Sequence, residues 1–304
     1  MPKRQEPSKP DKQAATKHIY TSKAQKTLLN ILTIDFEEWY HPEYVKDKCP
    51  EGKSDRATDD LSPTLDLLEK HKIEATFFIV GEIAQKYPEL IKQIEHKGHE
   101  VGFHSFNHIP LWEKNADTLT AEIRKFHALI GKNCMGYRAP SFSLNNNTKW
   151  ALNVLANCGY KYDSSIFPVS TPLYGVKHAP TKPYKISPAD VSIEDEDAQL
   201  WEFPLHVYST PILRLPMAGG FYLRFFPLKL VKRSINKANK NGHPAVLFVH
   251  TWELNPAMPK LKLGLYKSFI TYHNAEKTAP KLEQLLLQYE FTSFRAYMKE
   301  KGLE

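Results

Sequence analysis

The sequence has few cysteines and lacks a long hydrophobic run. Its three cysteines, Cys49, Cys134 and Cys158, are odd in number and show no paired spacing. We therefore expect free thiols in a reducing compartment rather than a disulfide framework. The strongest apolar runs, ATFFIVG and AVLFVHTW, are far shorter than the roughly 18 consecutive apolar residues that indicate a membrane-spanning helix. No transmembrane segment is expected.

A secretory signal is also missing, because the basic amino terminus is not followed by an apolar segment. We expect a cytoplasmic protein. The net charge is +7, but residues 1–26 account for +5 of it, which leaves +2 for the remaining 278 residues. This first segment is predicted to be a basic, disordered tail that solubilises the chain or touches an anionic membrane surface or polymer. The nearly neutral remainder, without a recognition motif, argues against nucleic-acid binding.

Strand and helix patterns alternate from about residue 28 onward. The chain is long enough for one α/β domain over residues 27–304. Buried strands are predicted over 28–36, 74–80, 99–103, 134–140 and 160–165. Helices are predicted over 61–72, 84–98, 119–131 and, starting at an Asn cap, 147–159. This alternation predicts parallel βα units wound into a barrel or an open sheet.

The later part of the chain has a weaker pattern. Residues 167–243 are rich in Pro, Gly and aromatic residues and show little periodicity, so long loops with short strands are expected there, shaping a cleft. Residues 274–294 predict a helix and a closing strand. The sequence does not indicate an oligomeric state.

Polar residues that could bind a metal or transfer a proton lie where the predicted strands end. They are Asp35, His104 with His108, Arg138, Asp163 and His250. In α/β barrels the active site is built from the carboxyl ends of the strands. We therefore expect these side chains to meet at one rim.

The histidine pair suits a metal ion. Residues four apart lie on one face of a helical turn, so both imidazoles of His104 and His108 can reach one ion at about 2.0–2.1 Å. Asp35, Glu37 and Glu38 offer a carboxylate, and along a strand Asp35 and Glu37 face the same side. The alternatives are two ordinary surface histidines and a solvated acidic turn.

Two further residues suit proton transfer at such a site. His250 ends an apolar strand, and an unperturbed pKa near 6.5 allows a histidine to act as general acid; the alternative is a hydrogen-bonded structural histidine. Arg138 can hold a carboxylate in its ionised form; the alternative is a surface salt bridge.

Four motifs then occur in a fixed order. They are TIDFEEW (33–39), HSFNH (104–108), YRAP (137–140) and LFVH (247–250). Together they resemble the polysaccharide deacetylases of carbohydrate esterase family 4, the NodB-homology fold. YDSS (162–165) and MAGGFYLRFFP (217–227) further resemble the branch associated with bacterial exopolysaccharide loci. The resemblance covers residues 28–255, and residues 256–304 would add a C-terminal helix and strand.

The resemblance implies a distorted (β/α) barrel of about seven parallel strands, with the active site at their carboxyl ends. It implies metal-dependent removal of N-acetyl groups from the amino sugars of a poly- or oligosaccharide. By position, Asp35 would be the catalytic base, His104 and His108 metal ligands, His250 the general acid, and Arg138 the group that positions Asp35. The divalent ion would be Zn²⁺, with Co²⁺ or Ni²⁺ as alternatives.

One departure from the family pattern bears on the metal. Many members have two adjacent aspartates in the first motif, whereas Phe36 follows Asp35 here. The metal carboxylate is then expected to be Glu37 rather than Glu38. Asp163 is expected to tune His250, as a late acidic residue does in relatives; otherwise it forms part of a turn. The backbone N–H of Ser141 would stabilise the developing oxyanion.

Other functions remain open at this point. An amidohydrolase acting on a small cyclic amide would keep the metal site, and a sugar O-acetyl esterase would need the same residues. A catalytically silent glycan-binding module has no need for a base, a metal site and an acid together. Several aromatic residues near the rim are candidates for stacking on sugar rings: Trp39, Tyr40, Trp112, Phe221, Tyr222 and Trp252.

Overall fold

The structure is a computed structural model that describes residues 28–132, 134–255 and 257–303. The tail predicted over residues 1–26 lies outside the described residues. In the described part, no helix combines the length and the apolar character that crossing a bilayer requires.

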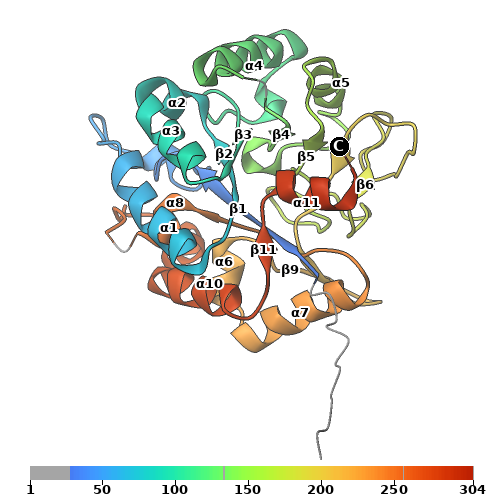
Figure 1. The fold of residues 1–304 in the computed structure, drawn as a ribbon. Coiled ribbons are helices and arrows are strands. Elements are labelled where there is room, and N and C mark those ends of the chain that lie inside the picture. The colour runs from blue at the N-terminus through green and yellow to red at the C-terminus, as the bar shows by residue number, and fades with distance from the viewer. Residues whose placement is uncertain (1–27, 133, 256, 304) are drawn as a thin grey trace, which may run out of the picture.

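A curled sheet of mainly parallel strands forms the centre (Figure 1). Its hydrogen-bonded order is β10-β1-β2-β3-β4-β5-β7-β6, and β11 also pairs with β1. Seven strands, β10 to β7 in this order, run parallel, and β6 is antiparallel to β7. The strands are β1 Asn30–Phe36, β2 Thr76–Ile79, β3 Glu100–Phe103, β4 Gly136–Tyr137, β5 Tyr162–Asp163, β6 Tyr184–Lys185, β7 Trp201–Glu202, β10 Val246–His250 and β11 Phe291–Thr292. The predicted α/β fold with about seven parallel strands is confirmed, and among the described strands no pairing joins β6 to β10, so the barrel stays open.

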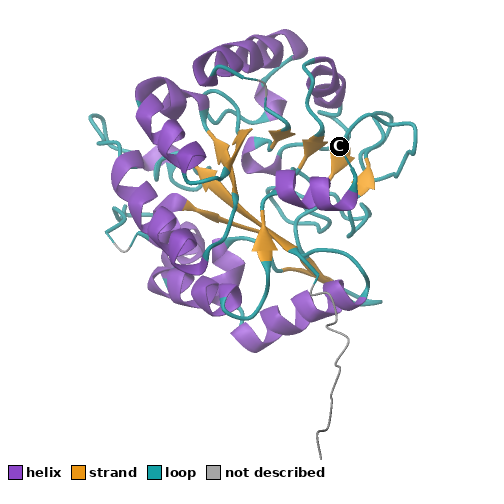
Figure 2. Ribbon diagram, viewed as in Figure 1, coloured by secondary structure: helices purple, strands orange, loops and turns teal. Residues whose placement is uncertain are grey.

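Helices surround this sheet, and a small separate hairpin completes the chain (Figure 2). The hairpin consists of β8 Val207–Ser209 and β9 Arg214–Pro216. The helices are α1 Ala57–His71, α2 Gly81–Lys86, α3 Pro88–His96, α4 Ala116–Ile130, α5 Trp150–Asn157, α6 Gly220–Phe225, α7 Leu228–Lys240, α8 Thr251–Leu254, α9 Leu265–Tyr272, α10 Thr278–Leu286 and α11 Phe294–Lys301. Short 3₁₀ turns include η2 Leu111–Glu113 and η3 Pro140–Phe142.

The central strands are buried on both faces. Every residue of β1, NILTIDF, is buried, and so is every residue of β2, TFFI. Continuous burial of this kind is typical of parallel strands that are covered on both sides. The strands are thereby fixed in register, and their carboxyl ends meet at one edge of the sheet.

Two helix predictions need correction. The helix predicted over 84–98 is two helices that meet at Tyr87–Pro88, because proline disfavours the α conformation of the residue before it; Tyr87 has φ −131° and ψ 60°. The helix predicted from an Asn cap at 147 begins at Trp150, and its N-cap residue, Lys149, makes no side-chain capping bond.

The segment predicted as loops over 167–243 contains α6 and the 13-residue helix α7. The inward face of α7 consists of Val231, Ser234, Ile235 and Ala238. The helical period of α7 is clear, but Lys, Arg and Asn occupy most of its other positions, so the mean hydropathy of the segment is low. The predicted helix and closing strand at the C-terminus are confirmed as α10 and β11, while α11 was not expected.

Sheet register brings the predicted rim residues together. Asp35 of β1 lies beside His250 of β10 and beside Phe78 of β2. Phe103 of β3 pairs with Ile79 of β2, so His104, the next residue, leaves the sheet at the same edge. The carboxyl edge of the sheet therefore carries the site.

Candidate active site

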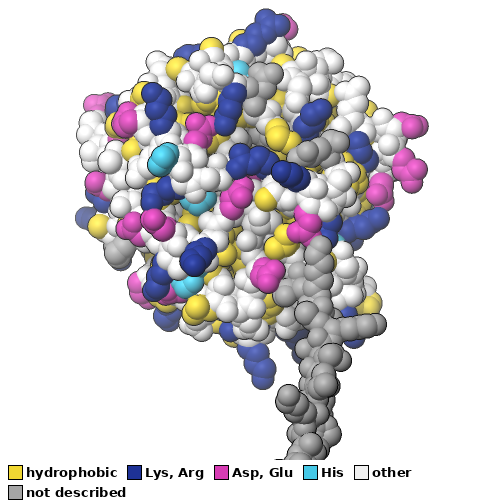
Figure 3. Space-filling view, viewed as in Figure 1, with side chains coloured by type: hydrophobic (Ala, Val, Ile, Leu, Met, Phe, Trp, Pro, Cys, Tyr) yellow, Lys and Arg dark blue, Asp and Glu magenta, His cyan; other side chains and the backbone are white. Residues whose placement is uncertain are grey.

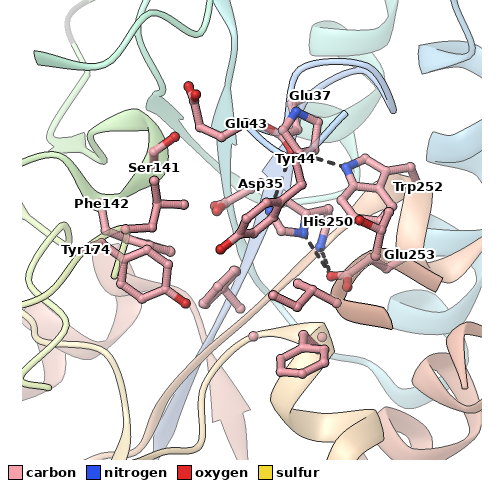
Figure 4. Close-up of a pocket in the computed structure, with 18 of the residues that line it drawn as sticks. Asp35, Glu37, Glu43, Tyr44, Ser141, Phe142, Tyr174, His250, Trp252 and Glu253 are labelled. Atoms are coloured by element: carbon pink, nitrogen blue, oxygen red, sulfur yellow. Dashed lines mark hydrogen bonds and ion pairs between the residues drawn. The ribbon is translucent and has the colours of Figure 1, made fainter. Parts of the chain in front are cut away.

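A pocket opens at the carboxyl ends of β1, β3 and β10, with about 810 Å³ of empty space including its open mouth. Figure 4 shows Asp35, Glu37 and His250 at this pocket. Six of the eight predicted site residues line it: Asp35, Glu37, His104, His108, Ser141 and His250. Arg138 and Asp163 are fully buried outside the lining.

Glu37, His104 and His108 form a group that could hold a metal ion. Their ligand atoms lie within 4.8 Å of one another, and all three residues are buried. Glu37 Oε2 lies 2.5 Å from His108 Nε2 and 4.0 Å from His104 Nε2. Two imidazoles and one carboxylate form a common ligand set of catalytic zinc sites, which leave a further position open.

The polar atoms at this group fit a cation better than they fit one another. Glu37 Oε2 is buried and accepts no hydrogen bond from the described residues, although His108 Nε2 is close. An unsatisfied buried carboxylate oxygen costs free energy unless it has a partner. A divalent ion between these atoms would supply that partner, so the residues fit the metal that the resemblance implies.

The two histidines are held in orientations that suit ligands. His104 Nδ1 lies 2.8 Å from the carbonyl oxygen of Arg138, which leaves Nε2 free on the pocket side. Burial lowers the pKa of His104 to about 4, which favours the neutral form that a metal requires. The ring of His108 stacks on His41, with centroids 5.4 Å apart and 12° between the planes.

The pair is not on a helical turn, contrary to expectation. Residues 104–108 contain no helix: residues 106–108 form a bend, and Ser105 has φ 65° and His108 has φ 53°. Positive φ is uncommon for residues other than glycine. A left-handed turn rather than a helix therefore brings the two imidazoles together.

Glu38 binds the start of α1 and is not part of the histidine group. Its carboxylate accepts hydrogen bonds from the backbone N–H groups of Arg56 and Ala57 at 2.8 and 3.0 Å, which are the unpaired donors at the start of α1. Burial raises the pKa of Glu38 to about 7. Of the two glutamates, Glu37 is thus the one that lies with the histidine pair.

Asp35 is held by a buried guanidinium group. Arg138 Nη1 donates to Asp35 Oδ1 at 2.6 Å and to Thr33 Oγ1 at 2.7 Å. The other N–H groups donate to the carbonyl and hydroxyl oxygens of Ser164, both at 2.9 Å. Arg138 has no exposed surface, so this is a buried ion pair rather than a surface salt bridge. Its geometry orients one carboxylate oxygen of Asp35 toward the arginine.

His250 is paired with a residue that the sequence analysis missed. Its Nδ1 lies 2.8 Å from Glu253 Oε2, and its backbone N–H donates to the same oxygen at 3.1 Å. Burial by itself lowers the pKa of His250, but the carboxylates of Glu37 and Glu253 raise it to about 9. The imidazolium form is therefore favoured at neutral pH. The sequence signal was the i, i+3 spacing of His250 and Glu253 at the start of a helix.

Glu253 is itself fixed by α6. Arg224 pairs with Glu253 Oε1 and donates to the carbonyl oxygens of Ile270, Thr271 and His273. Burial by itself raises the pKa of Glu253, but Arg224 and His250 lower it to about 2. A Cβ at Gly220 would lie 2.2 Å from Glu253 Oε2, so only glycine leaves room for this carboxylate.

The prediction that Asp163 tunes His250 is wrong. The Asp163 carboxylate accepts hydrogen bonds from the backbone N–H and the hydroxyl of Ser165, and Ser165 Oγ in turn accepts the N–H of Ala139. Asp163 thus forms the turn that was its alternative, and it supports the loop after Arg138. Asp163 is engaged by Ser165, whereas Nδ1 of His250 is already engaged by Glu253.

Ser141 lies in a strained turn at the pocket. Ser141 and Phe142 have φ 54° and 50°, a left-handed conformation that costs about 1–2 kcal/mol per non-glycine residue. The N–H of Ser141 donates to no carbonyl in the described part of the chain. Strain of this kind is often found at functional sites. Of the predicted rim aromatics, Phe221, Tyr222 and Trp252 line the pocket, whereas Trp39 is buried outside its lining.

Comparison with known families agrees with this geometry. Residues 47–162 match the polysaccharide deacetylase family model, and residues 164–299 match a domain family of unknown function, DUF3473. Over residues 47–162 the chain therefore contains a polysaccharide deacetylase domain. His104, His108, Arg138 and Ser141 fall within the first match, and Arg224, His250 and Glu253 fall within the second. One sheet joins both segments, since β10 pairs with β1.

Curated relatives match part of this chain. The chain is 37% identical over 94 residues to a peptidoglycan-N-acetylglucosamine deacetylase of Bacillus cereus, covering 29% of this chain and 34% of that protein. It is 30% identical over 184 residues to a peptidoglycan deacetylase of Helicobacter pylori, covering 57% of each. The chain thus spans about a third to just over half of these relatives.

A solved structure supports the fold. A Mycobacterium smegmatis protein assigned to the polysaccharide deacetylases superimposes with a TM-score of 0.54 at 17% identity, covering 90% of each chain. At this identity the likeness concerns the fold alone. It agrees with the curled arrangement of mainly parallel strands in this chain.

Proposed function

We propose that this chain is a metal-dependent N-deacetylase that hydrolyses the N-acetyl groups of amino sugars in a poly- or oligosaccharide and releases acetate. One observation carries the proposal. A buried carboxylate, Asp35, and a histidine favoured in its protonated form, His250, face one pocket beside the Glu37–His104–His108 group. Hydrolysis of an amide needs a base for the water and an acid for the departing amine.

The metal would be held by Glu37, His104 and His108, and we propose Zn²⁺, with Co²⁺ or Ni²⁺ as alternatives. When bound, a divalent ion lowers the pKa of water and polarises a carbonyl group. The remaining roles belong to side chains and backbone groups of this chain.

Asp35 acts as the base in this proposal. Arg138 engages Oδ1 at 2.6 Å, which leaves Oδ2 to accept the proton of the attacking water. The ion pair also restricts the orientation of the carboxylate, so the base is already oriented before the reaction begins. The N–H of Ser141, free of a carbonyl partner in the described chain, donates to the acetamide oxygen as negative charge develops there.

His250 acts as the acid. Glu253 engages its Nδ1 at 2.8 Å, so Nε2, which lies 3.5 Å from Glu37 Oε1, carries the transferable proton. Protonation of the nitrogen is required because an amide anion is a poor leaving group. The carboxylates of Glu37 and Glu253 favour the charged imidazolium before the reaction.

The proposal also concerns the type of polymer that carries the N-acetyl groups. Relatives named as peptidoglycan deacetylases and the motifs that resemble the exopolysaccharide branch favour a bacterial cell-wall glycan or exopolysaccharide. The proposed substrate is such a polymer that contains N-acetylated amino sugars.

Acetate release from N-acetylglucosamine oligomers tests the proposal. The protein would be stripped of metal, reloaded with Zn²⁺, Co²⁺ or Ni²⁺, and assayed beside Asp35→Asn and a matched exposed control, Asp197→Asn. We expect metal-dependent release that is lost in Asp35→Asn and kept in Asp197→Asn. Metal-loaded protein that releases no acetate from any oligomer would contradict the proposal.

A further inference from the structure

The charge of residues 27–304 is unevenly distributed along the chain. Residues 203–275 contain ten Lys or Arg and a single Asp or Glu, so they carry +9. Residues 27–202 and 276–304 together carry −7, which gives the net +2 of residues 27–304. The single carboxylate in the positive stretch, Glu253, is buried and paired with Arg224. A small net charge therefore conceals one strongly basic stretch.

Exposed apolar side chains occur in the same stretch, on the helices α6 and α9. They are Phe225 (46% exposed), Leu265 (95%), Tyr266 (61%) and Phe269 (42%). The ring centroids of Phe225 and Phe269 are 6.1 Å apart, and they lie 5.6 and 6.0 Å from that of Phe221. We call these five residues the α6–α9 face. Single exposed hydrophobic residues are common, but a contiguous patch indicates a binding surface.

The two helices that carry this face are tied together. Arg224 of α6, which is buried, donates to the carbonyl oxygens of Ile270, Thr271 and His273 at the end of α9. The apolar side chains are therefore held on a preformed surface. Such a surface loses little conformational entropy when a partner binds.

The face borders the catalytic pocket. Phe221 belongs to the face and lines the pocket, and so does Ile270 of α9 line it. On the other side, Tyr44 lines the pocket, and its ring lies 6.1 Å from that of Tyr266. A partner bound to the face would therefore lie next to the pocket.

Unpaired lysines flank the face. Lys260 and Lys262 precede α9 and are exposed, Lys267 lies within α9, and Lys229 is exposed at the start of α7. None of these four lysines pairs with a carboxylate in the described part of the chain. Because three residues of chain span at most about 11 Å, Lys262 and Lys267 lie close to Leu265.

This combination of charge and apolar surface selects one partner. An anionic bilayer offers phosphate groups to the lysines and an acyl boundary to the leucine and the aromatic rings. A second copy of this chain would place one positive face against another, which charge repulsion disfavours, and residues 1–26 are positive as well. Nucleic acid would pair with the lysines but would leave Leu265 without an apolar partner.

We propose that the α6–α9 face docks on a membrane surface that contains anionic phospholipids. The apolar side chains enter the headgroup region, and the flanking lysines contact the lipid phosphates. Docking in this way brings the pocket next to the bilayer. The inference does not depend on the proposed function, because docking requires no turnover.

Vesicle binding tests the proposal. The full chain would be sedimented with vesicles of phosphatidylcholine alone and with vesicles of phosphatidylcholine mixed with phosphatidylglycerol. We expect binding to the mixed vesicles and little binding to the neutral ones. Binding should decrease between about 0.1 M and about 1 M salt, because salt screens exposed charges. Every variant keeps residues 1–26, so the charge of that segment is the same throughout.

Substitutions on and beside the face separate the two contributions. Leu265→Ser should weaken binding to the mixed vesicles about fivefold to tenfold, the size expected for partial burial of one leucine. Lys260→Gln combined with Lys262→Gln should weaken it about fivefold for each lysine, as expected for a cation near an anionic surface. Circular dichroism and acetate release from soluble oligomers should be unchanged in Leu265→Ser, since Leu265 does not line the pocket.

The matched controls lie outside the basic stretch. Ile193 is 54% exposed in an acidic loop, residues 190–197. Figure 3 shows Asp and Glu side chains at this edge of the molecule, beside β6. Lys92 and Lys161 are exposed lysines. Ile193→Ser, and Lys92→Gln combined with Lys161→Gln, should bind the mixed vesicles as the parent does.

Several results would overturn the proposal. A full chain that leaves the mixed vesicles unbound would exclude docking. Equal binding by the parent and both sets of face variants would assign the binding to another segment of the chain. Binding to soluble heparin as tight as that to the vesicles, and unaffected by Leu265→Ser, would mean that charge alone is recognised. A dimer in analytical ultracentrifugation that Leu265→Ser dissociates, without vesicle binding, would make a second copy the occupant.

Discussion

Two buried arginines, one in each family-matched region, hold a carboxylate at the pocket. Arg138 pairs with Asp35, and Arg224 pairs with Glu253; both arginines are at most 2% exposed. In each case the remaining guanidinium N–H groups donate mainly to backbone oxygens or hydroxyl groups. The difference lies in what the carboxylate then does. Asp35 itself is the proposed base, whereas Glu253 acts through the imidazole of His250.

This difference shows how the two regions divide the proposed chemistry. Residues 47–162 contain two histidines of the candidate metal group and the arginine that pairs with the proposed base. Residues 164–299 contain the proposed acid, the carboxylate that pairs with it and the arginine that pairs with that carboxylate. If this division is correct, substitutions in the first region should remove metal or base function, and those in the second should remove acid function with the metal retained.

The largest effect is expected from the metal ligands. His104→Ala and His108→Ala each remove one of three ligands, so metal retention after dialysis and acetate release should both be abolished. His178→Ala, at an exposed position, is the matched control and should keep both. Elemental analysis would measure the bound metal, and the acetate assay would measure activity. Full activity in either ligand variant would disprove the assignment of the site.

Next come the two arginines. Arg138→Met and Arg224→Met each leave a buried carboxylate without its partner, which costs about 3–5 kcal/mol in the free energy of unfolding. Urea denaturation should show losses of similar size in both variants and almost none in the exposed control Arg233→Met. A loss of stability confined to Arg138→Met would show that the two arginine–carboxylate pairs do not contribute equally to stability.

A smaller effect on rate alone is expected at the acid. His250→Gln removes the proton donor but none of the three proposed metal ligands, so the metal should stay bound. We expect kcat to fall at least about 100-fold, because general acid catalysis typically contributes a factor of this size to the rate. Metal content and kcat would be measured on the same preparation. Loss of metal together with activity would place His250 among the ligands instead.

The smallest effect is expected at Glu253. Its negative charge raises the pKa of His250, so Glu253→Gln should lower that pKa and move the alkaline limb of the kcat profile to lower pH, because the protonated acid is lost sooner as pH rises. At neutral pH we expect a decrease of about tenfold. Glu276→Gln, at an exposed position, should leave the profile unchanged. An unshifted limb would mean that Glu253 only orients the ring.

Much of the fold and the site could be predicted because short-range patterns specify them. The run NILTIDF predicts a buried strand, and the polar residues after such strands must meet where parallel strands end. Glu253 was missed because its contact with His250 depends on a four-residue helix, α8, that carries no period of its own. Arg224 was missed because its partners are 29 to 49 residues away in the chain.

The sequence by itself determined the alternation of strands and helices, the order of the motifs and the residue types at the strand ends, since all three depend on neighbours within a few positions. Only the tertiary structure decided which carboxylate serves which partner. Glu37 rather than Glu38 joins the histidines, and Glu253 rather than Asp163 pairs with His250. Sheet order and the direction of each turn set these distances, and both arise from packing across the whole chain.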